Sequence, residues 1–339
     1  MNLSKLDLKS IGRTGEPWYI FLARLLIFIP FLRIPNNAII QTYRLDFMLP
    51  FILFCPKNPK VVFSDEPMRV FKTKHSLLSK IVVPLYEIYK QLCLRKIDRL
   101  ITDEATSRYY QKHGWFNRKI TIMPTSGVDL DKFKPMNSTK IREEYGFESD
   151  EKIIVFVGRV ERIKRIDFLI DSFFLVKKVV PKSRLLIVGS GADKEYEEHL
   201  KSMISEYALE NVQFTGNSPP ESIPKIINCT DVLALCSEVE GSPTVVREAI
   251  ACGVPVVSTE VGDVRSIIKN DYVGRIAKKD VSDFALCLLH VLKMDKETVK
   301  AKCRRLAEEL LGFDRLVERY LEVYRELCTV KKQRVHIEN

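Results

Sequence analysis

The sequence predicts an α/β protein with two domains, each built on a doubly wound parallel sheet. Three observations support this fold class. The 339 residues are enough for two separate hydrophobic cores. Short apolar runs of strand length alternate with helical segments along the chain, as in sheets with helices on both faces. The charge is also divided, because residues 1–135 hold 22 Lys and Arg against 11 Asp and Glu, whereas residues 136–339 hold 32 against 33.

The first part of the chain opens with a polar segment, residues 1–17, that shows no clear element. It has no apolar core followed by a small-residue cleavage site, so we expect no signal peptide. Trp18 to Phe31 is strongly apolar, but Arg24 and Arg33 bracket its second half and Pro30 interrupts it. The uninterrupted stretch is too short to span a bilayer. We expect an amphipathic or buried helix there, with an interfacial helix as the alternative.

Alternating strands and helices follow up to residue 123. Strands are expected at 38–40, 60–63, 99–102 and 120–123, and helices at 44–54, 77–99 and 105–113.

The second part is more regular. Strands are expected near 153–157, 184–188, 211–215, 231–236, 255–259 and 272–277. Residues 280–311 form a helical pattern that Gly312 breaks, and 313–328 forms a last amphipathic helix. The run 185–191 ends in Gly-Ser-Gly and has only two of the three glycines of a dinucleotide fingerprint, so that signal is weak.

One stretch, residues 236–262, carries the clearest chemistry. Two apolar runs that read as buried strands enclose one helix, for which Ser242 is a good N-cap and Pro243 a good first residue. Gly241 allows a ligand to approach the backbone closely. The free amides of Ser242, Thr244 and Val245 would then face a phosphate, which the helix dipole favours.

Two glutamates flank this anion site. Glu240 precedes the helix, and Glu248 lies about two turns into it, with seven residues between them. Carboxylates on both sides of a phosphate are suited to accept hydrogen bonds from hydroxyl groups, and hydroxyl-rich groups around a phosphate describe a sugar nucleotide. The alternative is a surface-loop glutamate and a solvated helix glutamate, and this is the commoner situation for an isolated pair.

A second pattern agrees with this interpretation. The apolar run 153–157 is followed by Gly158, Arg159 and, five residues later, Lys164. Two cations on a loop between a strand and a helix suit a diphosphate. Such a pattern is weak by itself, because most loop cations are only solvated.

Together the two motifs resemble the family-4 retaining glycosyltransferases. Residues 240–257 follow the pattern E-G-x-P-x4-E-A-x-A-C-G-x-P-V-V, and residues 158–164 follow G-R-x4-K. The resemblance covers residues 120–328 well and the first 120 poorly, because the chain lacks the Gly-rich loop near its start, and Ser-Asp-Glu at 64–66 stands where members often carry a histidine.

The resemblance implies a GT-B fold: a short acceptor-side domain (1–127), a linker (128–137), a donor domain (138–311), a helix crossing back to the first domain (312–330) and a polar tail (331–339). It also implies site roles. Gly158, Arg159 and Lys164 would hold the donor diphosphate with the amides at 242, 244 and 245. Glu240 would bind a sugar hydroxyl, Glu248 the ribose hydroxyls, and Asn217 would line the base pocket.

No cofactor or metal is expected. Asp129 and Asp131 spell D-x-D, but they lie in the linker-like run, where a structural turn is the better interpretation. The five histidines show no metal-ligand spacing. None of the eight cysteines forms C-x-x-C, which favours buried reduced thiols and a cytosolic protein over disulfides or zinc.

The net charge of +10 belongs to the first part of the chain. A basic surface attracts nucleic acid or anionic lipid. No nucleic-acid-binding motif accompanies it, so lipid head groups or lipid diphosphates are favoured, with plain solubility as the open alternative.

These observations lead to one main functional hypothesis. The chain would be a retaining hexosyl- or acetylhexosaminyltransferase that transfers a sugar from a nucleotide diphosphate sugar to a lipid-linked or cell-surface glycan. It would be cytoplasmic and peripheral at the inner face of the membrane. The rival hypothesis is a non-catalytic sugar-nucleotide-binding or partner subunit with a degenerate first domain, and a basic nucleic-acid-binding protein is a weaker one.

Overall fold

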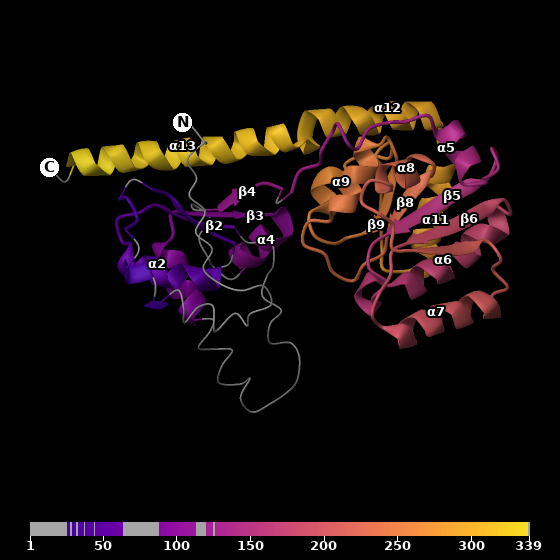
Figure 1. Cartoon of the computed structure of the whole chain (residues 1–339), viewed down its shortest axis with the longest axis horizontal. Helices are drawn as coiled ribbons and strands as arrows, with labels where there is room; N and C mark the ends of the chain where they lie inside the picture. Colours follow the sequence, from indigo (N-terminus) through magenta and orange to yellow (C-terminus); the bar gives the residue numbers. More distant parts are fainter. Residues whose placement is uncertain are drawn as a thin grey trace. The chain divides into compact units, whose positions relative to one another are not determined.

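The computed structural model describes residues 26–27, 29–31, 33–36, 38–43, 45–63, 88–112, 120–124 and 126–337. The chain divides into two compact units: unit 1 comprises Met1–Met123 and Leu321–Asn339, and unit 2 comprises Pro124–Tyr320. Each unit has its own sheet, and every strand pair within the two sheets is parallel. The predicted α/β fold with two parallel sheets is therefore confirmed (Figure 1).

Unit 1 contains a four-stranded sheet in the order β1-β2-β3-β4. Its strands are β1 (Ile40–Thr42), β2 (Lys60–Phe63), β3 (Arg99–Thr102) and β4 (Ile120–Ile122), and the short helices are η2 (Ile29–Phe31), η3 (Leu45–Met48), α2 (Leu49–Phe54), a helix at 88–96 and α4 (Glu104–Lys112). All four predicted strands are present, and the first begins two residues later than expected. Most of Trp18 to Phe31, the first part of the 77–99 helix and residues 64–66 lie outside the described residues.

The last helix, α13 (Phe313–Ile337), belongs to unit 2 at its start and to unit 1 from Leu321 onward. In unit 1 its Glu326 pairs with Arg99 of β3 at 2.9 Å, and Val323 and Leu327 are buried. The prediction that the final helix returns to the first domain is confirmed. The helix continues past the expected end at residue 328, because no glycine or proline interrupts residues 329–337.

Unit 2 contains a six-stranded sheet in the order β10-β9-β8-β5-β6-β7. The strands are β5 (Lys152–Val157), β6 (Ser183–Val188), β7 (Val212–Gly216), β8 (Val232–Leu235), β9 (Val256–Thr259) and β10 (Gly274–Ala277), and each matches a predicted strand. From β5 the chain first builds outward through β6 and β7, then returns to the other side of β5 with β8. The junction of β5 and β8 is thus the topological switch point, where doubly wound sheets bind ligands at their carboxyl ends.

Helices cover both faces of this sheet (Figure 1). Successive residues of β5 alternate between two cores: Ile153 and Val155 pack on one face, and Ile154 and Phe156 on the other. The helices of unit 2 are α5 (Ser138–Glu144), η5 (Arg162–Lys164), α6 (Ile166–Val179), α7 (Lys194–Glu206), α8 (Ile223–Asn228), α9 (Thr244–Ala251), α10 (Val264–Ile267), α11 (Val281–Leu292), α12 (Lys296–Leu306) and the π turn η6 (Ala307–Leu311).

Two helix boundaries differ from expectation. The helical pattern at 280–311 is not one helix but two, because Asp295 starts a new one: its carboxylate accepts the amide of Thr298 at 2.8 Å and caps α12. The helix expected to be capped by Ser242 begins instead at Thr244, with Pro243 in the extended cap position.

All eight cysteines are free thiols, and seven of them are buried. Burial raises the pKa of Cys229, Cys252 and Cys303 to about 12, so these thiols are protonated, non-nucleophilic core groups. No helix within the described ranges combines the length and apolar character that crossing a membrane requires.

Candidate functional site

The loops that follow β5 and β8 meet at the switch point and are bound to each other. The amide of Glu238 donates to the carbonyl of Ile163 at 2.8 Å, and the thiol of Cys236 donates to the carbonyl of Lys164 at 3.1 Å. The hydroxyl of Thr259, at the end of β9, donates to the carbonyl of Ser237 at 2.9 Å. These bonds fix the η5 turn that carries Lys164 against the loop that carries Glu240.

Lys164 and Glu240 are brought into direct contact. The Lys164 Nζ lies 2.6 Å from the Glu240 Oε1, and the side chains are 18% and 14% exposed. Ser237 donates its hydroxyl to the same oxygen at 2.6 Å. Limited solvent access strengthens such charge-assisted bonds. Two residues predicted from separate motifs therefore form one charged centre at the carboxyl edge of the sheet.

Arg159 is less engaged. Its side chain is 74% exposed and pairs with Glu161 at 2.6 Å, two residues further along the same loop. Arg165, directly after Lys164, has a φ of +52°, in the left-handed region that non-glycine residues seldom adopt. That conformation separates the η5 turn from α6, and such strain is often found at functional sites.

The start of α9 lies on the β8 side of this centre. Because the helix begins at Thr244, the amides of Thr244 and Val245 have no acceptor within the helix. Ser242 precedes the cap and donates its hydroxyl to Asp263 at 2.9 Å instead of capping the helix. The expected Ser242 cap is therefore wrong, while two of the three amides predicted to face an anion stand at the helix start.

Glu248 is not a solvated helix carboxylate. Burial raises its pKa above the ordinary glutamate value, and the positive charge of Lys132 opposes that shift only in part. Its carboxylate is only partly exposed and has no ion-pair partner among the described residues, so it is well placed to accept hydrogen bonds from ligand hydroxyls. The ribose role predicted for it stays a prediction.

Three glycines bring the loops at this edge into backbone contact. Two of them follow β6. A Cβ on Gly189 would lie 2.0 Å from the carbonyl oxygen of Gly158, and a Cβ on Gly191 would lie 1.8 Å from the carbonyl oxygen of Val160. A Cβ on Gly262, whose φ is +51°, would lie 2.1 Å from the carbonyl oxygen of Gly241. The glycines at 189 and 191 thus serve close packing with the loop after β5.

Asn217 follows β7, two strands away from β5. Its side-chain oxygen accepts the hydroxyl of Ser190 at 2.7 Å, so it is tied to the loop after β6. It is exposed, and its assignment to a base pocket stays a prediction.

Sequence reasoning missed Ser237, Arg247 and Asp263. Arg247 and Asp263 form a buried ion pair behind the start of α9, with side chains 0% and 2% exposed. A signal existed for Arg247, since it interrupts the otherwise apolar face of the helix. Its partner Asp263 lies on the loop after β9, and no local sequence pattern marks it.

In the parts of the chain that the structure describes, no group of three or more His, Cys, Asp or Glu side chains is arranged to hold an ion. Asp129 instead accepts the amides of Asp131 and Lys132, both at 3.0 Å, and so forms a turn in the linker.

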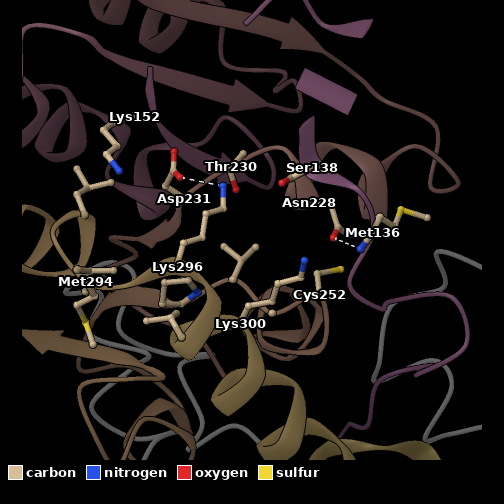
Figure 2. Close-up of a pocket in the computed structure, with 16 residues that line it drawn as sticks. Met136, Ser138, Lys152, Asn228, Thr230, Asp231, Cys252, Met294, Lys296 and Lys300 are labelled. Carbon is tan, nitrogen blue, oxygen red and sulfur yellow. Dashed lines mark hydrogen bonds and ion pairs between the residues drawn. The ribbon is translucent and has the colours of Figure 1, made fainter. Parts of the chain in front are cut away.

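A pocket lies at the opposite edge of the same sheet, where β5, β8 and β9 begin. Figure 2 shows Lys296 reaching Asp231, at 3.1 Å, and Lys300 near Cys252. Asp231 also accepts from Arg142 and from the amide of Ile153, so its carboxylate serves to join elements there. Because ligands of doubly wound sheets bind at the carboxyl ends of the strands, we place the candidate site at the other edge.

Comparison with known proteins shows the family of the chain. The family model described as "Glycosyl transferases group 1" matches residues 137–309, just over half of the chain. The chain belongs to the group 1 glycosyltransferases. The match contains both predicted motifs and every candidate site residue named above, from Gly158 to Glu248.

Curated relatives of this family member include two proteins named D-inositol 3-phosphate glycosyltransferase. The one from Segniliparus rotundus is 32% identical over 159 residues, covering 46% of this chain and 35% of the relative. The one from Mycolicibacterium smegmatis is 30% identical over 236 residues, covering 68% of this chain and 52% of the relative. The matched part of the chain thus spans about a third to a half of the length of these relatives.

Solved structures share the fold of this glycosyltransferase family member. Sucrose-phosphate synthase from Thermosynechococcus elongatus has a TM-score of 0.73 at 19% identity, over 97% of this chain and 83% of that one. The Anabaena protein HepE, in complex with UDP, has a TM-score of 0.74 at 16% identity, over 91% and 82%. At these identities the likeness establishes the GT-B fold.

Proposed function

We propose that this chain is a retaining glycosyltransferase that uses a nucleotide diphosphate sugar as its donor. The observation that carries the proposal is the contact between Lys164 and Glu240 at the switch point, next to the first amides of α9. A cation and helix amides suit a diphosphate, and a carboxylate suits a sugar hydroxyl. All three chemistries meet within the part of the chain that matches the family.

The chemistry follows from where charge develops. As the bond between sugar and diphosphate breaks, negative charge grows on the leaving phosphate, and preorganised donors stabilise that charge. Lys164, Arg159 and the amides of Thr244 and Val245 would supply those donors. Glu240 would orient a hydroxyl of the transferred sugar, and Glu248 the ribose. No residue is proposed as a covalent nucleophile, and no metal is needed in this scheme.

Uridine nucleotides are the first donors to test, because HepE was solved in complex with UDP. The acceptor we propose is a lipid-linked or cell-surface glycan presented at the inner face of an anionic membrane. The basic first 135 residues support this, since each basic residue near an anionic surface contributes about 1 kcal/mol.

The test begins with a thermal-shift screen of UDP, GDP and ADP sugars. A ligand at about 100 times its Kd adds roughly 2.7 kcal/mol to the stability of the protein that binds it. Donors that stabilise the protein are then assayed for sugar transfer to isolated membrane lipids, with Lys164→Ala as the control. Transfer by the wild type alone supports the proposal. Binding without transfer or hydrolysis would favour the hypothesis of a non-catalytic subunit. If no donor binds, both the glycosyltransferase and the non-catalytic sugar-nucleotide-binding subunit are refuted.

A further inference from the structure

A buried ion pair lies directly behind the start of α9, and no step proposed above uses it. Arg247 is on α9, next to Glu248, and Asp263 follows β9, next to Gly262. Nη2 of Arg247 contacts Oδ2 of Asp263, and the side chains are 0% and 2% exposed. The pair therefore joins the helix start to the loop after the neighbouring strand and is almost completely shielded from water.

The pair also reaches the residues that set the direction of the first turn. Nη1 of Arg247 donates to the carbonyl of Pro243 at 3.3 Å, and Oδ2 of Asp263 accepts the hydroxyl of Ser242 at 2.9 Å. The Ser242 hydroxyl lies 3.4 Å from that of Ser126. Because Pro243 is the helix cap, its position determines where the amides of Thr244 and Val245 point.

Stability is a poor explanation for this pair. Nε of Arg247 and Oδ1 of Asp263 are buried without a hydrogen-bond partner among the described residues. Burying two charges costs free energy, and each unpaired polar atom adds to that cost. Apolar residues of similar volume often stabilise a protein as well or better in such places. The geometry that the pair imposes on its neighbours is the better explanation.

We propose that Arg247 and Asp263 are positioning residues that hold Ser242, Pro243 and the first amides of α9 in the arrangement that receives the donor diphosphate. Neither side chain touches the donor. The ordering of the loop is a property of the protein itself, whereas the identity of the anion rests on the proposed function. The two can therefore be tested apart.

The decisive variant replaces both partners by apolar residues, Arg247→Met with Asp263→Val, which keeps the total side-chain volume similar and leaves no unpaired charge. Amide hydrogen exchange in residues 241–247 reports the order of the loop without any ligand. Affinity for UDP, measured by calorimetry, reports the diphosphate site. Arg265→Met is the matched control, because it removes the exposed Arg265–Glu260 pair, 53% and 49% exposed, from the same loop.

We expect the double variant to keep the melting temperature of the wild type or exceed it. Exchange in residues 241–247 should accelerate about tenfold, and affinity for UDP should fall about tenfold, while the control changes neither. Wild-type exchange in a folded double variant would overturn the proposal. If the wild type binds no UDP, the exchange measurement still decides the positioning role, and only the proposed function is affected.

If the double variant does not fold, Ser242→Ala takes its place. Ser242→Ala removes only the hydroxyl that reaches Asp263 and leaves the buried pair intact. It should accelerate exchange of the Val246 amide, which donates to the carbonyl of Pro243 at 3.3 Å, by a smaller factor, about threefold. Unchanged exchange at this amide would count against the proposal.

Discussion

Glu240→Gln tests the charged centre most directly, because it keeps the shape of the side chain and removes its charge. Lys164 then loses a partner at 2.6 Å, in a pair whose side chains are 18% and 14% exposed. An exposed pair contributes less than about 1 kcal/mol and a bond to a buried charged group up to about 3. For this intermediate case we expect a loss of about 1–2 kcal/mol, or a fall in Tm of about 2–8 °C.

Binding should respond in the opposite direction. A diphosphate competes with Glu240 for Lys164, so removing the Glu240 charge removes that competition. Affinity for UDP should rise by up to roughly 5- to 30-fold, the equivalent of about 1–2 kcal/mol. Turnover with the UDP sugar should fall, because the proposed hydroxyl acceptor is weakened. Calorimetry with UDP and a steady-state transfer assay separate the two effects.

Glu161→Gln is the control. It also removes one partner of an ion pair in the site, but there the Arg159 side chain is 74% exposed, so we expect a stability change below about 1 kcal/mol. The reasoning is refuted if Glu240→Gln lowers affinity for UDP. Glu240 would then act by holding Lys164 in place, and competition with the diphosphate would be the wrong description.

Three further predictions concern the remaining residues and the membrane. Burial raises the pKa of Glu248, so wild-type donor affinity should decrease as the pH falls through that raised value, while Glu248→Gln should show no such dependence in calorimetry. The same shift means that Glu248 favours folding at low pH and that this contribution is lost as the pH rises, so the substitution should stabilise the protein most at neutral pH. Lys164→Ala and Arg159→Ala should each lower turnover while changing Tm only slightly, and the loss of turnover should be larger for the less exposed Lys164. Full activity in either variant would show that the residue matches the G-R-x4-K pattern by accident. The protein should co-sediment with anionic vesicles and be released by salt, and equal partitioning to neutral vesicles would exclude the electrostatic mode of binding.

The strands of unit 2 could be predicted because their apolar runs are continuous. A strand buried on both faces, such as Lys152–Val157, needs apolar residues at nearly every position, and glycines or polar turns mark its ends. The strand order was not predictable from such runs, because pairing depends on contacts between segments far apart in the chain. The position of the switch point between β5 and β8 could therefore be established only from the tertiary structure.

Local chemistry was misleading where a tertiary contact competed with it. Ser242 followed by proline is a good helix start in isolation. In the folded protein the Ser242 hydroxyl is bound to Asp263, so it is not available to the helix amides, and α9 begins at Thr244. Asp295 shows the reverse case, since its local capping of α12 divides a pattern that periodicity alone read as one helix.

The sequence by itself determined the fold class, the six strands of unit 2 and the two motifs that hold Lys164 and Glu240, because these depend on residue spacing within short segments. Only the tertiary structure decided which charges meet. Lys164 and Glu240 are 76 residues apart and form one ion pair, whereas Arg159 turns to its neighbour Glu161 and stays exposed. Arg247 on α9 likewise forms an ion pair with Asp263, which follows β9. Ion pairs have no periodicity along the chain, since their energy depends on distance and burial in three dimensions.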